Sequence, residues 1–513
     1  MSAVSVRQPH QLPLPSWTLS IAVLIVFSTA GPIVVGWPLL ALSGVAALVM
    51  VVAAFLHPAF AVYVVLLTTP LLAGMNRGAL FPGLRPNEAL ALLLGAAVLG
   101  RGVVQTAARR ALSIRVRSTD GALVLLVVTG SVMPLLWLLA RGEPVLQDDL
   151  LYSMTLWKYY LLYLLVRSSI KTDHQVRRCL WVSMASGAVV GIIGILQALG
   201  LFGVSDLLAT YYAPGGDTEA LYLSRGSSTL AHPQAMADVM VMNLAIAVAW
   251  VARARSHRWL LVPASVLFLV ASLASGQFSG LVALFAGMGA LALLTRQLRR
   301  KVFALVPAVV LAGLLLTPVI EERLTSISPS QGLPTSWVAR IENLETYVLP
   351  KLSKDFNYAL GVRPSARIPK SADTDDGYVY IESGHAWLLW IGGIPFLVAF
   401  IVFVSAQIRT TARIAQHPFD GVSVAATASF TGLVVLAVVT TFDPHLTLRG
   451  AADLNFSLLA LAHVGLGNSA SVNRAGGAGE DRRLEARQNS VDSWDPRRVG
   501  PGPRHRSTRT AQV

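Results

Sequence analysis

The stretch GYVYIESGHAWLLWIGGIP, residues 377–395, begins as a polar loop and continues as an apolar helix. The apolar run extends to residue 408, and so reaches the roughly 20 residues that a helix needs to cross a bilayer. Glu382 and His385 lie where the polarity changes, and their spacing of three places them on one helix face. The stretch predicts a membrane helix with a carboxylate and an imidazole at its entrance.

Composition extends this prediction to the whole chain. Of its 513 residues, 54% are hydrophobic and 13% are charged, whereas about 25% are charged in a soluble domain. The mean hydropathy is +0.60. We therefore expect an all-α polytopic membrane protein. The single cysteine, Cys179, excludes a disulfide framework. Because nucleotide-binding and zinc-hydrolase motifs are absent from the sequence, we expect no ATP-driven work, no zinc hydrolysis and no cofactor.

Apolar runs of membrane-spanning length recur along the chain and predict about fourteen transmembrane helices. They lie near residues 16–35, 37–55, 58–75, 87–104, 119–140, 150–167, 179–200, 234–252, 258–275, 278–295, 302–320, 385–408, 422–442 and 452–468. The predicted organisation is an N-terminal segment at 1–15, a transmembrane domain at 16–468 and a tail at 469–513. The tail is rich in Gly, Ser, Arg and Pro, so we expect it to be disordered.

Lysine and arginine are distributed unevenly between alternate loops. Most of them fall in one alternating set, which includes loops 101–118 and 167–178 and both termini. Since basic loops remain on the cytoplasmic side of a membrane, both termini are predicted to be cytoplasmic. Loops 201–233 and 321–384 are then external, and the larger one lies between the eleventh and twelfth helices. The net charge of +14 is explained as an orientation signal, and no nucleic-acid partner is expected.

The large external loop is predicted to be partly helical. In TSWVARIENLETYVLPKL, residues 335–352, apolar side chains recur at helical spacing. These side chains are Trp337, Ile341, Leu344 and Val348. The pattern predicts a helix with one apolar face that ends at Pro350. Such a helix could lie on the membrane surface or cover a cavity.

External arginines are candidates for substrate binding, because membrane topology gives them no role. Arg225 lies directly before a predicted span, Arg340 lies on the loop helix, and Arg363 lies in LGVRPSARIPK. Arginine is always ionised and binds phosphate oxygens bidentately. Converging external arginines would therefore suit a phosphorylated substrate. The alternative is that each arginine pairs with an acidic residue of the same loops.

Two charged residues lie inside predicted spans. Lys158 is near the middle of span 150–167, and Asp238 is about one turn inside span 234–252. Ionisable residues within a membrane are energetically costly, so both are candidates for substrate binding. The alternative is that they pair with each other or play a structural role.

Glu382 and His385 are candidates for the proton acceptor, because either could take a proton from a substrate hydroxyl at the interface. The alternatives are that Glu382 is an ordinary helix cap and that His385 is an interfacial histidine with satisfied hydrogen bonds. A separate possibility lies in QDDL, where Asp148 and Asp149 could hold a divalent metal in a metal-dependent lipid-linked glycosyltransferase.

Three segments together resemble the superfamily of O-antigen ligases and O-antigen or exopolysaccharide polymerases. They are SRGSSTLAHPQAMADVMVMNLAI (224–246), LASGQFSGLVALFAGMGAL (273–291), and SWVARIENLETYVLPKLSKDFNYALGVRP (336–364) followed by YIESGHAWLLWIGGIPFLVAFIVF (380–403). The resemblance covers about residues 215–410. It implies a metal-independent inverting glycosyltransferase that takes a glycan from a polyprenyl diphosphate carrier on the outer face of the plasma (inner) membrane.

The resemblance also implies roles for individual residues. The catalytic arginines of the superfamily fall on Arg225 and Arg340, and its His-Pro motif places His232 among the substrate-binding residues. The position of the ligase histidine is held by Glu382, with His385 one turn further. Many polymerase-like members carry an acidic residue there, so the resemblance favours a polymerase over a ligase that acts on a lipid acceptor.

The implied partners are a polyprenyl-diphosphate-linked oligosaccharide, the lipid bilayer, and other polysaccharide-assembly proteins such as a flippase or a chain-length regulator. A rival interpretation from another class is a transporter or flippase of lipid-linked glycans. It would use the same arginines for binding and would form no bond.

Overall fold

The computed structural model describes residues 38–77, 83–107, 118–212, 221–253, 257–325, 335–370, 377–417 and 420–464. The predicted first span, 16–35, and the segments 1–15 and 469–513 lie outside these residues. The described part is all-α apart from one short β-hairpin. The helical prediction is confirmed.

Six of the described helices are long and apolar enough to cross a membrane. They are α4 (Pro86–Ala107), α5 (Ser118–Ala140), α7 (Asp173–Ala198), α9 (Pro233–Arg253), α18 (Gly384–Ala415) and α19 (Gly421–Val439). Shorter apolar helices accompany them: α2 (Pro38–Leu56), α3 (Pro58–Leu72), α10 (Arg258–Ala274), α11 (Phe278–Leu294) and α20 (Ala451–Ala462). The chain is thus a multi-pass membrane protein. One further long helix, α6 (Gln147–Ser169), carries charged residues among its apolar ones.

The predicted span 302–320 is not one helix. The chain forms three short helices there, α12 (Arg296–Phe303), α13 (Val306–Leu315) and α14 (Thr317–Thr325). Pro307 and Pro318 lie in the first turns of α13 and α14. Proline fits the first turn of a helix but cannot continue one, because it lacks a backbone N–H. The apolar composition predicted a span of full length, and the two prolines divide it.

The predicted loop helix is also divided. It begins at Thr335 as α15 (Thr335–Asn343), continues as one π-helical turn (Leu344–Val348), and is followed by α16 (Leu349–Ser353). Pro350 therefore lies in the first turn of a new helix and does not end the earlier one. Val348 is buried, whereas Ile341 is exposed. The predicted apolar face is only partly covered.

The core of the described residues is centred on α9, which packs against α7, α10, α11 and α19. Nearly every residue from Ala235 to Val251 is buried. Small residues on the neighbouring helices allow this close packing: Gly187 of α7 faces Asn243, and Gly287 of α11 faces Val241. A side chain at either glycine would collide with α9, so these contacts fix how deeply α9 lies in the bundle.

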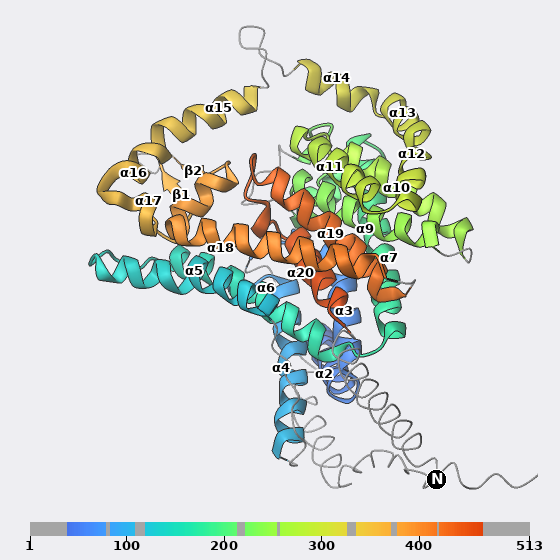
Figure 1. The fold of residues 1–513 in the computed structure, drawn as a ribbon, viewed down its shortest axis with the longest axis horizontal. Coiled ribbons are helices and arrows are strands. Elements are labelled where there is room, and N and C mark those ends of the chain that lie inside the picture. Colours follow the sequence, from blue (N-terminus) through green and yellow to red (C-terminus); the bar gives the residue numbers. More distant parts are fainter. Residues whose placement is uncertain are drawn as a thin grey trace, which may run out of the picture. The chain divides into compact units, whose positions relative to one another are not determined.

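A kink in α18 receives the loop that precedes it in the chain. Gly393 has φ of 62° inside the helix, a conformation that favours glycine, and Pro395 follows. The short helix α17 (Asn357–Leu360) packs against this kink, where any side chain at Gly393 would meet the carbonyl of Ala359. Figure 1 shows α5 running beside α18, and Trp137 of α5 donates a hydrogen bond of 3.1 Å to the Gly361 carbonyl. The paired glycines therefore form a docking point for the loop.

Candidate functional site

One arginine and two carboxylates from distant segments meet in a cluster, which we call the Arg340 site. The Nε of Arg340 lies 3.2 Å from Oε2 of Glu382, and its Nη2 lies 3.2 Å from Oδ1 of Asp443. A second hydrogen bond, from Nη1 to Oδ2 of Asp443, also measures 3.2 Å. Asp443 is buried, and Glu382 is exposed. The structure therefore brings together two of the predicted catalytic residues, and it adds Asp443.

Aromatic packing positions Arg340. Trp337, one turn earlier on α15, stacks on Phe442 with ring centroids 5.2 Å apart. It also meets the edge of Phe278, the first residue of α11, at 6.0 Å. Phe442 directly precedes Asp443 in the chain. The apolar face of the loop helix thus holds Arg340 against this carboxylate.

Glu382 is not the cap of α18. Ser383 is the N-cap, and its hydroxyl accepts a hydrogen bond from the Ala386 amide. The Glu382 carboxylate instead faces Arg340. The side chain is 41% exposed, and the burial of the rest removes enough water from the carboxyl to raise its pKa above the ordinary value. The charge of Arg340 lowers this pKa, and that of Asp443 raises it. A carboxylate with a raised pKa is a better proton acceptor near neutral pH than an ordinary one.

His385 lies in the first turn of α18, and its side chain is exposed. Among the described residues, it forms no hydrogen bond. Glu382 and His385 therefore differ: the former is held by Arg340, and the latter is oriented by no other side chain in the described part.

Arg225 lies in a tight connection between helices. The amide of the next residue, Gly226, donates a hydrogen bond of 2.8 Å to the Ala274 carbonyl at the end of α10. Gly276, between α10 and α11, packs against the Cβ of Arg225. The same connection leads to Phe278, which contacts Trp337 of α15. Arg225 and the helix that carries Arg340 therefore both contact the connection between α10 and α11.

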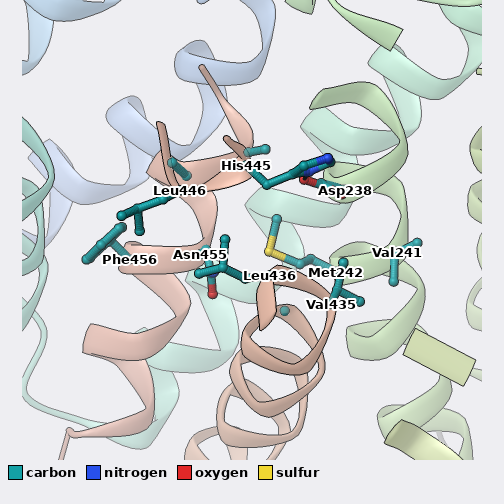
Figure 2. A pocket seen from close by; sticks show the side chains of 12 residues that line it. Asp238, Val241, Met242, Val435, Leu436, His445, Leu446, Asn455 and Phe456 are labelled. Carbon is teal, nitrogen blue, oxygen red and sulfur yellow. Dashed lines mark hydrogen bonds and ion pairs between the residues drawn. The ribbon is translucent and has the colours of Figure 1, made fainter. Parts of the chain in front are cut away.

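Asp238 has a partner that the sequence did not predict. Its Oδ2 lies 2.6 Å from Nδ1 of His445, in the 3₁₀ turn η6 (His445–Thr447), and both side chains are buried. The pair lies at a cavity of about 20 Å³ between α9, α19 and α20. Figure 2 shows Asp238 and His445 side by side there, with Met242 and Asn455 nearby. A cavity of this size has room for one water molecule.

Lys158 and Asp238 do not pair with each other. Nζ of Lys158 lies 3.2 Å from Oδ1 of Asp453 on α20 and 4.0 Å from Oε1 of Glu88 on α4. It also lies 4.5 Å from the centroid of the Tyr159 ring. The lysine therefore links α4, α6 and α20.

His232 directly precedes α9 and is half-buried. The pKa of this imidazole is lowered to about 4. Burial is the main cause, and the nearby cations Arg449 and Arg85 contribute to the decrease. The imidazole is therefore neutral at physiological pH, and it can donate one hydrogen bond to an anion.

Arg363 belongs to a structural contact, which we call the loop anchor: Arg363 and Arg367 with Asp149 and Asp148. Arg363 binds Asp149 bidentately, at 3.1 Å from Nε to Oδ1 and 2.6 Å from Nη2 to Oδ2. Asp149 is fully buried. Arg367 lies 3.2 Å from Asp148. Arg363 therefore pairs with an acidic residue, which was the alternative to substrate binding. The acidic residue lies at the start of α6 and not in the same loop as Arg363.

The anchor also bears on the metal interpretation. Both oxygens of Asp149 are engaged by Arg363, and Oδ2 of Asp148 lies 3.2 Å from Arg367. Within the described ranges, no group of three or more His, Cys, Asp or Glu residues could hold a metal ion. These residues offer no assembled metal site.

Sequence reasoning missed Asp443 and His445. Both lie in FDPHLTLRG, residues 442–450, a short polar segment between two apolar helices. An aspartate and a histidine around a proline, at a membrane boundary, were the available signal. Their partners Arg340 and Asp238 lie far away in the sequence, so the pairing itself could not be inferred from spacing.

A scan against models of known protein families found no match, and a search of proteins with curated functions found none either. The function therefore has to be argued from the site.

Proposed function

We propose that this protein is a membrane glycosyltransferase that extends a glycan with repeat units from a polyprenyl diphosphate carrier on the outer face of the plasma membrane. The proposal includes fourteen transmembrane helices, of which the divided segment 302–320 would form one interrupted crossing. Both termini would be cytoplasmic, and the Arg340 site would face outward.

The observation that carries the proposal is the Arg340 site. An arginine that binds phosphate and a carboxylate that accepts a proton are the two groups that this reaction needs. Arg340 and Glu382 lie 3.2 Å apart. Asp443 holds the guanidinium from the other side, so Arg340 is oriented before any substrate binds. Arg225, at the neighbouring connection, would supply a second cation.

The proposed step balances as follows. Glu382 takes the proton from the acceptor hydroxyl as its oxygen forms a bond to C1 of the donor sugar. The bond from C1 to the diphosphate oxygen breaks, and the electron pair leaves with the polyprenyl diphosphate. Attack from the face opposite the leaving group inverts the anomeric centre. Arg340 and Arg225 stabilise the charge that develops on the departing diphosphate.

Arg340 has a second effect on Glu382. As a nearby cation it lowers the pKa of this carboxyl, against the larger increase from burial. When the donor diphosphate engages the guanidinium, this stabilisation of the carboxylate weakens, and Glu382 becomes a stronger base. Donor binding would thereby prepare the proton acceptor.

The test is glycan transfer by purified protein with a defined polyprenyl-diphosphate-linked repeat unit. We expect Arg340→Ala and Arg225→Ala each to lower the rate by roughly 10²–10³, the usual cost of one group that stabilises transition-state charge. Arg409→Ala is the matched control, because this arginine is exposed on α18. Transfer at the wild-type rate by either of the first two variants would end the assignment.

A further inference from the structure

A second group of cations, separate from the Arg340 site, gathers where three loops meet helices α4 and α6. We call it the basic cluster: Arg77, Arg85, Lys158 and Arg449 with the carboxylates Glu88 and Asp453. Oε1 of Glu88 lies 3.0 Å from Arg85, 3.7 Å from Arg77 and 4.0 Å from Lys158. One carboxylate thus serves three cations.

Contacts between loops build this cluster. Gly450, next to Arg449, packs against Leu230 and Ala73, and its amide donates a hydrogen bond of 2.9 Å to Asp453. The Tyr159 hydroxyl donates a hydrogen bond of 3.1 Å to the Thr447 carbonyl. The segments that carry Arg77, His232 and Arg449 are therefore fixed beside Lys158.

Positive charge is in excess here. Arg449 is partly buried, and among the described residues it forms no ion pair or hydrogen bond. The pKa of its guanidinium is lowered to about 10, chiefly by burial. The neighbouring cations Arg85 and Arg77 contribute to the decrease. Cations held together away from water need a counter-charge. Arg77 and Lys158 keep side-chain exposures of 32% and 22%, so the cluster can be reached from outside.

The adjacent surface is apolar. Helix α4 begins at Pro86, directly after Arg85, and exposes large apolar side chains along its length. They include Leu92, Leu93, Leu99 and Val103. A ligand with a charged head at the cluster could therefore lay a hydrocarbon chain along α4. This arrangement favours a phosphorylated lipid over a free anion.

We propose that the basic cluster is a second binding site, which takes the phosphate or diphosphate headgroup of a membrane lipid. Arg449 and Arg77 bind the phosphate oxygens, neutral His232 donates a hydrogen bond, and the lipid chain lies against α4. The site goes beyond the proposed transfer reaction and uses none of its catalytic residues. The segment 442–450 joins the two sites, since it carries both Asp443 and Arg449.

The test is equilibrium binding of farnesyl diphosphate to purified protein that carries Arg340→Gln, which weakens the first site. We expect Arg449→Gln in this background to weaken binding roughly ten- to a hundredfold, since hydrogen bonds to charged groups are lost. Arg77→Gln gives a second measurement on a more exposed side chain. Arg409→Gln is the charge-matched control, and wild-type affinity is expected for it.

Inorganic pyrophosphate and farnesol separate the sources of affinity. We expect farnesyl diphosphate to bind at least about tenfold more tightly than pyrophosphate, because the chain buries apolar area, and farnesol to bind weakly. Equal affinities for pyrophosphate and farnesyl diphosphate would contradict a lipid site. Unchanged affinity in both the Arg449 and the Arg77 variants would overturn the proposal, whatever the result of the transfer assay.

Discussion

The loop anchor and the Arg340 site both consist of arginines and carboxylates, yet their charge balance differs. In the anchor, the Arg363 guanidinium binds one buried carboxylate, Asp149, in bidentate geometry. At the Arg340 site, one guanidinium is shared by Glu382 and Asp443. In the anchor each arginine has its own carboxylate, and the two pairs fix a loop. The shared arrangement keeps a carboxylate whose protonation can change.

An arginine in the loop 321–384 is therefore not in itself a mark of function. By charge and position alone Arg363 and Arg340 were similar candidates, because both lie in the loop 321–384; only the family resemblance gave Arg340 a catalytic role. In the structure Arg363 contacts one carboxylate, whereas Arg340 contacts buried Asp443 and, in addition, the exposed Glu382. Asp149 is fully buried, whereas the Glu382 side chain is 41% exposed and open to a substrate.

Removal of the proton acceptor should have the largest effect on glycan transfer. We expect Glu382→Gln to lower the transfer rate by roughly 10²–10⁴, the usual contribution of a general base, while the thermal unfolding temperature changes little. The matched control is Glu345→Gln, an exposed glutamate on the same loop. If Glu382→Gln transfers glycan normally and His385→Gln does not, the histidine is the base instead.

Substitutions in the anchor should lower the stability of the protein. Arg363→Gln leaves the Asp149 carboxylate buried without its partner, so we expect a loss of about 3–5 kcal/mol in the free energy of unfolding. Arg367→Gln removes a pair that is 37% exposed on both sides, and we expect about 0–1 kcal/mol. Denaturant titration of purified protein measures both values. Equal losses in the free energy of unfolding would show that the buried pair does not stabilise the protein more than the exposed pair.

The pH dependence of transfer should report Glu382. Burial raises its pKa above the ordinary 4.5, and the base acts only when deprotonated. The rate should therefore fall as the pH is lowered, with the midpoint above pH 4.5. Arg340 lowers this pKa, so Arg340→Gln should move the midpoint of its residual activity to higher pH. A midpoint at or below 4.5 in the wild type would argue against Glu382 as the base.

The smallest expected effect is that of metal removal. Asp148 and Asp149 are bound by arginines, so transfer should continue at an unchanged rate in EDTA. The measurement is the same assay with and without the chelator. A loss of activity that Mg²⁺ or Mn²⁺ restores would favour the metal-dependent glycosyltransferase.

Much of the helical organisation was predictable, because apolar runs define it. The prediction 258–275 corresponds to Arg258–Ala274, and 119–140 corresponds to Ser118–Ala140. The prediction failed at 302–320, where composition is apolar but Pro307 and Pro318 begin new helices. The average hydropathy of a segment does not show where one helix ends and the next begins.

The site was less predictable, for a physical reason. Arg340 and Glu382 could be singled out by charge and position. Asp443, the second carboxylate that contacts Arg340, lies next to Phe442, whose ring stacks on Trp337 of the loop helix. Likewise, Asp238 and Lys158 were recognised as buried charges, but their partners His445 and Asp453 come from the end of the chain. Pairing across the bundle depends on helix packing, which one sequence does not reveal.

The most direct test of the central claim is reconstitution with one substrate. Purified protein is mixed with a single glycan repeat on polyprenyl diphosphate, and the lipid-linked products are sized over time. The account predicts chains of two or more repeats, inverted at the newly formed linkage, with wild-type protein and almost none with Arg340→Ala. Single repeats that stay unextended with wild-type protein, or normal extension without Arg340, would contradict it.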